Sequence, residues 1–285
     1  MTGLVFGKTG QVATELARRA AEDTPLIFLG RDQSDLSDPA ACAAAIKSAQ
    51  PDFVLNAAAW TAVDKAEEHE AEATVINGDA PGAMAQACAA LGIPFVHVST
   101  DYVFDGAGTQ RFATSDPVAP LGAYGRSKLA GERAVQDAGG AFIILRTSWV
   151  FSAHGANFVK TMLRLGRERD RLTVVADQIG GPTPAAAIAD AMLTCAKALS
   201  GGAQSGVEHF AGAPDTSWAG FAREIMTRAG LDCAIADIPT ADYPTPAQRP
   251  LNSRLDCSGL ARLGLEQPDW QAHLDSVLQE LESAS

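Results

Sequence analysis

A glycine-rich turn near the start of the chain limits its fold more than any other stretch. Residues 4–6, Leu-Val-Phe, are typical of a short buried strand, and a helical pattern begins soon after residue 10. The turn between them has the spacing Gly7-x-x-Gly10-x-x-Ala13 instead of the commoner Gly-x-Gly-x-x-Gly. Strand, glycine turn and helix in this order are the context in which a dinucleotide fingerprint has meaning. Gly7 permits the tight turn, and Gly10 lets the backbone approach a pyrophosphate at the helix N-terminus. The cofactor residues predicted here are Gly7, Gly10, Gln11 and Val12, and the alternative is an ordinary glycine turn.

The first half of the chain goes on to alternate apolar strands with helical segments. Strands are expected at residues 26–29, 53–55, 95–99 and 142–147, and helices at 39–49, at 70–91 and around Tyr124. This alternation is typical of a parallel sheet with helices on both faces. After residue 149 it is lost, because the helices expected at 157–169, 185–199, 218–229 and 270–281 are accompanied by one strand, 172–175.

We therefore predict an α/β protein, a Rossmann-like doubly wound parallel sheet with a smaller C-terminal substrate domain. Residues 1–148 would form the dinucleotide-binding domain, with 176–205 returning to it. Residues 149–175 and 206–285 would form the smaller substrate-binding domain.

The end of the second expected strand bears on which dinucleotide fits. Proteins strict for NAD place an acidic residue there to hold the ribose 2′-hydroxyl, but this chain has Gly30-Arg31-Asp32. Arg31 could stack on adenine and meet a 2′-phosphate, so we expect NADPH to be accepted at least as well as NADH. Asp35 and Leu36 could flank the adenine. The alternative for Arg31 is a solvated turn residue.

Small residues follow the third expected strand. They let a cofactor lie against the backbone, although simple tight packing explains them equally well. The cofactor contacts predicted here are Ala57, Ala59, Trp60 and Thr61. Two other polar residues, Asn77 and His97, lie in apolar segments and are interpreted as structural.

Three residues carry a pattern for acid–base chemistry at a carbonyl. Tyr124 and Lys128 are four residues apart and share one face of a helix. A phenol is a poor acid at neutral pH, and a neighbouring ammonium lowers its pKa. Thr100 follows a buried strand, where ligands of open α/β sheets bind, and its hydroxyl could bond the same carbonyl oxygen. The spacing alone is weak, since a solvated helix face can carry it.

Composition excludes several classes of partner and site. Among 285 residues the formal net charge is −12, so the chain has no general attraction to nucleic acid or anionic membranes. No apolar run reaches the roughly 20 residues of a membrane span, and strand-like sequence from residue 4 leaves no room for a signal peptide. Five scattered cysteines without Cys-x-x-Cys indicate reduced, mostly buried thiols in a cytoplasmic protein. The scattered histidines show no zinc spacing.

Longer sequence motifs narrow the set of families that this chain resembles. The glycine turn and Tyr124-x-x-x-Lys128 resemble the extended short-chain dehydrogenase/reductase superfamily, and within it the chain, from residue 3 to about 260, resembles the dTDP-4-dehydrorhamnose reductase family. The strings that carry the resemblance are Asn56-Ala-Ala-Ala-Trp-Thr-Ala-Val-Asp-Lys-Ala-Glu67, Ser99-Thr-Asp-Tyr-Val-Phe-Asp-Gly106, Tyr124-Gly-Arg-Ser-Lys-Leu-Ala-Gly-Glu132, Arg146-Thr-Ser-Trp-Val150, Asn157-Phe-Val-Lys-Thr-Met-Leu-Arg-Leu165, Asp177-Gln178, Pro182-Thr183, Arg249-Pro250 and Asn252-Ser253.

The resemblance implies a reaction and roles for single residues. The family reduces the 4-keto group of dTDP-4-dehydro-L-rhamnose with NADPH or NADH to give dTDP-L-rhamnose, a donor for polysaccharide. Tyr124 would protonate the sugar oxygen, Lys128 would hold the nicotinamide ribose and lower the Tyr124 pKa, and Thr100 would bond the carbonyl oxygen. Asp101, Trp149 and Asn157 would contact the substrate. Arg249, in a Pro-rich segment, is a candidate for a phosphate contact, with a surface arginine as the alternative.

The resemblance also bears on a possible metal site, on a dimer and on alternative functions. Some family members hold Mg²⁺ at a subunit contact of a homodimer, and Glu15 matches one of the acidic ligands. Residues 184–187 read Pro-Ala-Ala-Ala where a further glutamate is expected, so Mg²⁺ is uncertain. One alternative function is a non-catalytic NADP-binding regulatory subunit, which could do without Tyr124 or Lys128. Another is a different nucleotide-sugar reductase, epimerase or dehydratase, although the acidic pair of a dehydratase is missing because Tyr102 follows Asp101.

Overall fold

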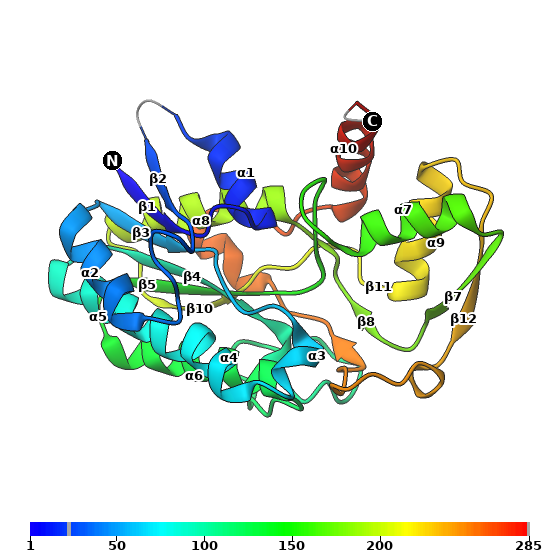
Figure 1. Cartoon of the computed structure of the whole chain (residues 1–285), viewed down its shortest axis with the longest axis horizontal. Coiled ribbons are helices and arrows are strands. Elements are labelled where there is room, and N and C mark those ends of the chain that lie inside the picture. Colours follow the sequence, from blue (N-terminus) through cyan, green and yellow to red (C-terminus); the bar gives the residue numbers. More distant parts are fainter. Residues whose placement is uncertain (22–23, 284–285) are drawn as a thin grey trace.

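The larger lobe is built on a parallel sheet. The computed structural model describes residues 1–21 and 24–283. Its six strands, all parallel to their neighbours, lie in the order β10-β5-β4-β3-β1-β2 (Figure 1). They are β1 (Gly3–Phe6), β2 (Leu26–Leu29), β3 (Phe53–Asn56), β4 (Phe95–Thr100), β5 (Phe142–Thr147) and β10 (Gly206–His209). The chain turns from β1 to β2 on one side and then to β3 on the other, so the order reverses at β1. This is the switch point where open α/β sheets bind ligands.

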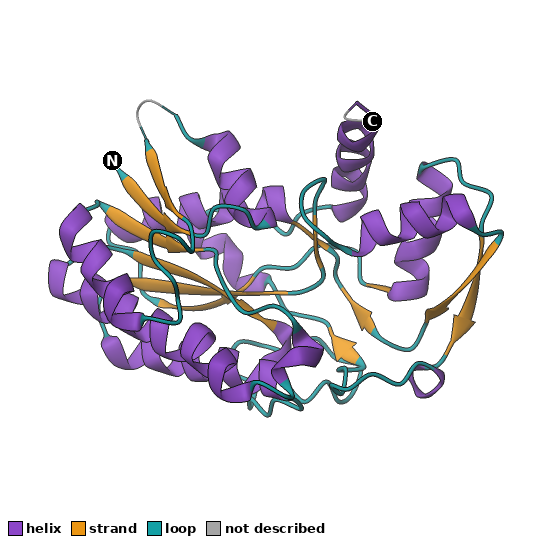
Figure 2. Ribbon diagram, viewed as in Figure 1, coloured by secondary structure: helices purple, strands orange, loops and turns teal. Residues whose placement is uncertain are grey.

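Helices cover both faces of this sheet, as predicted. The helices α2 (Pro39–Ala49), α5 (Ala80–Leu91) and α6 (Ala123–Ala138) lie on one face, and α1 (Gln11–Arg19) and α8 (Ala185–Ser200) on the other (Figure 2). Side chains along β1 alternate between the two layers: Leu4 and Phe6 join the core under α2 and α5, whereas Val5 joins the core under α1 and α8. Successive strand residues point to opposite faces, and both faces are buried, which is why the strands read as continuous apolar runs.

The helix expected at 70–91 is three segments instead of one. The short α4 (Glu70–Thr74) runs through a π-helical turn, Val75–Asp79, into α5. The π-helical turn lies against α6 so closely that a Cβ added at Gly131 would sit 2.0 Å from the Asn77 carbonyl oxygen. Pro81, in the first turn of α5, lacks an N–H to continue the regular bonding pattern.

The smaller lobe has its own core. It contains α7 (Phe158–Glu168), α9 (Trp218–Arg228), α10 (Trp270–Ser283) and a parallel pair of strands, β7 (Arg171–Val175) and β12 (Ala234–Ile238). Phe221 and Trp270 meet edge to face in this core, with ring centroids 5.1 Å apart. The expected boundary before residue 206 differs from the structure, because β10 adds to the large sheet beside β5, and Leu255, Leu260 and Leu263 also join the core of the larger lobe.

Short elements complete the structure. They are β6 (Val150–Phe151) paired with β9 (Thr183–Pro184), β8 (Ile179–Gly180) between β11 (Thr216–Ser217) and β13 (Asn252–Ser253), the helix α3 (Val63–Ala66), and 3₁₀ turns at Asp101–Val103, Thr240–Asp242 and Ser258–Leu263. The five cysteines are free and buried, as predicted. Within residues 1–21 and 24–283, no helix has the length and apolar character needed to cross a membrane.

Candidate active site

The glycine turn is open toward the carboxyl ends of the strands. Gly7 has φ +109°, and a Cβ there would lie 3.4 Å from the backbone of residues 57 and 58, whereas a Cβ at Gly10 would meet nothing within 4 Å. Gly10 caps α1 without a side-chain hydrogen bond. The first N–H groups of α1 therefore point, with the positive end of the helix dipole, into open space. This geometry fits a dinucleotide pyrophosphate.

Gln11 joins this turn to the smaller lobe. Its Oε1 accepts hydrogen bonds from Ser152 Oγ and Asn157 Nδ2, both at 2.9 Å. Asn157 also caps α7, since its Oδ1 accepts from the Lys160 N–H at 3.1 Å. The structure thus places Asn157 against the glycine turn, with both ends of its amide engaged. The expected substrate contact at Asn157 stays a prediction, and its observed role is to hold two segments together.

The residues predicted to meet adenosine differ in exposure. The Arg31 side chain is 82% exposed and lies 4.0 Å from the Asp35 carboxylate. The Ser37 N–H donates to Asp35, which lowers the pKa of that carboxyl. Leu36 is buried in the core with Ile46. Arg31 is therefore free to reach a ligand, whereas the Leu36 side chain faces the protein interior.

Asn77 fixes the loop that follows β3, a structural role that agrees with its interpretation from the sequence. Its Oδ1 accepts from the Trp60 N–H at 2.8 Å, and its Nδ2 donates to the Trp60 carbonyl at 3.0 Å and to Ser127 Oγ at 3.0 Å. One side chain on the π-helical turn thereby ties residues 57–61 to α6. The sequence feature that indicates this role is a single amide side chain in an otherwise apolar helical segment.

Thr100, Asp101 and Tyr124 come together at the end of β4. The Thr100 hydroxyl donates to Asp101 Oδ1 at 3.1 Å and lies beside the Tyr124 phenol. Burial raises the pKa of Tyr124, the Asp101 carboxylate raises it further, and the Thr100 hydroxyl opposes them. The structure thus brings together two of the three predicted catalytic residues.

Lys128 does not act on Tyr124 in this arrangement, contrary to the expectation that it lowers the Tyr124 pKa. Its Nζ donates to the Val98 carbonyl at 2.7 Å and lies 3.2 Å from His97 Nε2. Burial lowers the pKa of Lys128 to about 8, and the Glu132 carboxylate opposes this shift. The physical reason for the difference is that the Tyr124 phenol has no ammonium in hydrogen-bond contact among the described residues.

The expected sugar contacts Asp101 and Trp149 have features of ligand-binding groups. Asp101 is 3% exposed, its Oδ2 has no hydrogen-bond partner within the described chain, and burial raises its pKa to about 6. Trp149 has φ +50°, an uncommon backbone conformation for a bulky residue, and stacks on Trp218 with centroids 3.8 Å apart. A Cβ at Gly180 would lie 3.0 Å from the Trp149 ring. The indole is thus fixed between the two lobes.

Arg249 reaches the same region from the C-terminal part of the chain. Its Nη2 donates to Asp64 Oδ2 at 2.8 Å, and its Nη1 is buried without a partner in the described residues. Burial raises the pKa of Tyr102, the Asp101 carboxylate adds to this rise and the Arg249 charge opposes it. The Tyr102 ring meets the Tyr124 ring edge to face, with centroids 5.5 Å apart. Arg249 therefore lies at the site with one guanidinium nitrogen unused.

A buried ion pair lies behind these residues and was not predicted. Glu132 and Arg146 form a bidentate pair, with Oε–N distances of 2.9 and 2.6 Å and almost no exposure. Ser99 Oγ also donates to Glu132 at 2.6 Å. Because Glu132 follows Lys128 by four residues on α6, the pair braces the same helix face that carries Tyr124 and Lys128.

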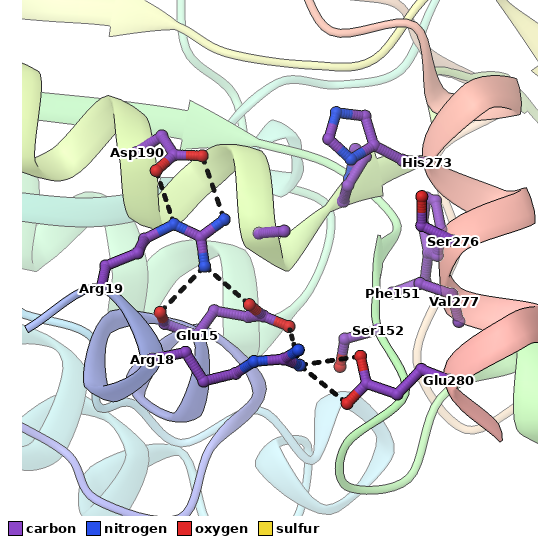
Figure 3. Close-up of a pocket in the computed structure, with 12 residues that line it drawn as sticks. Glu15, Arg18, Arg19, Phe151, Ser152, Asp190, His273, Ser276, Val277 and Glu280 are labelled. Carbon is purple, nitrogen blue, oxygen red and sulfur yellow. Dashed lines mark hydrogen bonds and ion pairs between the residues drawn. The ribbon is translucent and has the colours of Figure 1, made fainter. Parts of the chain in front are cut away.

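Glu15 lies away from this site, in a cavity of about 530 Å³ between α1, α8 and α10 (Figure 3). A ligand atom from each of Glu15, His154 and Glu280 falls within 4.8 Å of the others. Arg18 occupies their midst: its Nη1 is 3.5 Å from Glu15, 2.7 Å from Glu280 and 3.1 Å from His154. The other Glu15 oxygen pairs with Arg19 at 2.7 Å. Both Glu15 oxygens thus face guanidinium groups, and the residues as they lie do not fit Mg²⁺.

Comparisons with known proteins agree with this geometry. The RmlD substrate binding domain family matches residues 1–283. A dTDP-4-dehydrorhamnose reductase of Burkholderia thailandensis is 46% identical over 98% of both chains. The crystal structure of a Clostridium acetobutylicum dTDP-4-dehydrorhamnose reductase is 33% identical and has a TM-score of 0.93 over 99% of this chain and 100% of that chain. The Bacillus anthracis enzyme, solved in complex with NADP, is 31% identical and has a TM-score of 0.92, covering 98% and 99% of the two chains. The chain therefore belongs to the dTDP-4-dehydrorhamnose reductase family.

Proposed function

We propose that this protein reduces the 4-keto group of dTDP-4-dehydro-L-rhamnose with NADPH or NADH and forms dTDP-L-rhamnose. The observation that carries the proposal is the meeting of Thr100 and Tyr124 at the carboxyl end of β4, with Lys128 one turn along the same helix. The names of the relatives support the substrate, and the NADP complex of the Bacillus anthracis enzyme supports the cofactor.

The chemistry follows from where the hydroxyl groups lie. A bound dinucleotide supplies the hydride that the sugar C4 receives. The Tyr124 phenol donates its proton to the oxygen that was the ketone, and a partly buried phenol with a raised pKa is kept protonated for that step. Thr100 orients the carbonyl oxygen. Lys128, once in reach of the ribose, would hold it and favour the phenolate left behind.

Two groups with unused hydrogen-bonding capacity would hold the substrate. Asp101 Oδ2 lacks a donor, and a sugar hydroxyl would supply one. Arg249 Nη1 lacks an acceptor, and a diphosphate oxygen would supply one. The smaller lobe, with Trp149 at its edge, would close over the sugar and align C4 with the cofactor held by the larger lobe.

The cofactor preference follows from Arg31. An exposed guanidinium with no carboxylate at position 30 can bind the 2′-phosphate of NADPH. The dinucleotide would lie with its pyrophosphate at Gly7 and Gly10, Gln11 and Val12 at the helix start, and Ala57, Ala59, Trp60 and Thr61 along its other side.

A non-catalytic regulatory role is the alternative of a different class. It would need neither a protonated phenol in the site nor Thr100 beside it, so the presence of both favours an enzyme. The deciding test is NADPH consumption with the 4-keto sugar nucleotide made in situ. Tyr124→Phe should lower kcat by about 10²–10⁴-fold and leave NADPH affinity unchanged. Turnover of the variant near the wild-type rate would refute the assignment of Tyr124.

A further inference from the structure

His97 is fully buried on β4, and each of its two ring nitrogens contacts one polar side chain. Its Nδ1 lies 3.1 Å from Asn56 Nδ2 on β3, and its Nε2 lies 3.2 Å from Lys128 Nζ on α6. Asn56 is also buried. This chain of three side chains runs from the end of β3 to the amine of Lys128.

The direction of these hydrogen bonds is fixed at the Asn56 end. Asn56 Oδ1 accepts from the Ala58 N–H at 3.1 Å, so Nδ2 is the group that faces His97. An amide nitrogen only donates, and His97 Nδ1 must therefore be the acceptor. Rotating the Asn56 amide would set its N–H donors against the Ala58 N–H. The neutral imidazole consequently carries its proton on Nε2.

An Nε2–H that points at Lys128 has a consequence for the amine. An ammonium group has three donors and no lone pair, so it cannot accept from His97. A neutral amine can accept from His97 Nε2–H and still donate to the Val98 carbonyl at 2.7 Å. When Lys128 is uncharged, its contacts with His97 Nε2 and with the Val98 carbonyl are both hydrogen bonds. When Lys128 is charged, its contact with His97 Nε2–H sets one donor against another.

We propose that His97 is a positioning residue for Lys128: with its tautomer fixed by Asn56, it holds the Lys128 amine neutral in mildly alkaline solution and turned away from Tyr124 until a dinucleotide binds, when the amine takes up one proton from solvent. The charged ammonium would then leave His97 and donate to the ribose and toward Tyr124. The cofactor part of this inference rests on the proposed function, whereas the tautomer does not.

The surroundings of the amine agree with this inference. The titratable groups near it are His97 on β4, and Tyr124 and Glu132 one turn to either side on α6. Burial lowers the pKa of Lys128 to about 8 and Glu132 opposes the shift, so burial outweighs the carboxylate. Burial lowers the pKa of His97, which keeps the imidazole neutral.

The first test reads the tautomer directly in the ligand-free wild-type protein. Long-range ¹H–¹⁵N spectra of ¹⁵N-histidine-labelled protein distinguish an Nε2–H from an Nδ1–H imidazole, and the His97 signals are identified as those absent from His97→Gln. We expect the Nε2–H form at about pH 9, where a Lys128 amine with a pKa of about 8 is neutral. An Nδ1–H tautomer or an imidazolium at His97 would overturn the proposal. The tautomer is read in the wild-type protein, so the test remains decisive even if His97→Gln folds poorly. In that case the His97 signals can be assigned by selective labelling of the wild type instead of by comparison with the variant.

The second test measures protons taken up when NADPH binds without substrate. Calorimetry at about pH 9, in buffers of different ionisation enthalpy, should give close to one proton per site for the wild type, because that pH lies above the Lys128 pKa of about 8. His97→Gln offers an amide oxygen that accepts from a charged ammonium, so the uptake should be lost.

The matched control is His209→Gln, which removes a second buried histidine that lies beside Arg146 instead of Lys128. Its proton uptake should equal that of the wild type. Uptake that is absent in the wild type, or unchanged in His97→Gln, would contradict the inference. Neither result depends on turnover, so a failure of the reductase assay alone would reject the proposed function and leave His97 to be judged by these two measurements.

Discussion

The Asp101 carboxylate lies beside the Tyr124 phenol and raises its pKa. The same carboxyl is itself buried, with its pKa raised to about 6 and one oxygen unpartnered within the described residues. Two groups that each resist ionisation thus share one end of β4. This arrangement favours the protonated phenol that a proton donor needs, at a cost in stability.

That cost can be measured. The pKa of Asp101 in the folded protein is above its unfolded value of 3.8, so the stability that its protonated form contributes is full below about pH 4 and is lost as pH rises through 6. Asp101→Asn should remove this loss and raise the free energy of unfolding at pH 7 by about 1–3 kcal/mol relative to wild type. Urea unfolding of both proteins at pH 4 and pH 7 is the measurement. A variant less stable than wild type at pH 7 would show that the charged carboxylate is well solvated or paired.

Arg31→Ala should change the KM for NADPH but not the KM for NADH. Its exposed guanidinium can meet the 2′-phosphate of NADPH, which NADH lacks. We expect the KM for NADPH to rise by roughly tenfold, the worth of one charged hydrogen bond, and the KM for NADH to stay unchanged. Steady-state kinetics with both cofactors measure this. If the two KM values changed equally, Arg31 would not read the 2′-phosphate.

Arg249→Lys should weaken binding of the nucleotide diphosphate. A lysine cannot keep the Asp64 contact and present a second planar N–H at the same time. The expected loss is about 1.5–3 kcal/mol in dTDP affinity, with NADPH affinity unchanged. Calorimetric titration with each ligand tests this. Arg254→Lys, another partly buried arginine, whose Nη1 donates to Asn252 Oδ1, is the control and should bind dTDP like wild type.

Glu132→Gln should be strongly destabilising, because it leaves the Arg146 guanidinium charged in the core without a carboxylate. Removing one partner of a buried pair costs about 3–5 kcal/mol. The surface pair of Glu70 and Arg126 provides the comparison, since Glu70→Gln should cost about 0–1 kcal/mol. Thermal and urea unfolding of the two variants measure the difference. Equal losses would mean that the Glu132 site is open to water.

The parts of the fold that were predicted depend on local patterns. The glycine turn is recognisable because Gly7 and Gly10 follow an apolar strand, and Tyr124 and Lys128 share a helix face by spacing alone. The strand β10 was missed because its buried residues Glu208 and His209 are polar. Glu208 is paired with Arg262 at 2.6 Å, a partner far along the chain, so the strand carries no apolar signal.

The position of Lys128 could not be predicted for the same reason. Its partners His97 and Val98 lie about thirty residues earlier on β4, and a spacing of four on a helix says nothing about them. Asn77 and Glu132 likewise acquire their roles through segments that meet only in the folded chain. Local pattern therefore identified the residue types of the site, and tertiary packing decided what each one touches.

The alternation of side chains along β1 has a consequence for how this chain can change in length. Leu4 and Phe6 enter one core and Val5 the other, and Gly7 follows Phe6 directly. One residue inserted within β1 would exchange the two faces for every residue on one side of the insertion, or else push the turn out of line with residues 57 and 58. Insertions in this strand would therefore be accepted in pairs or not at all.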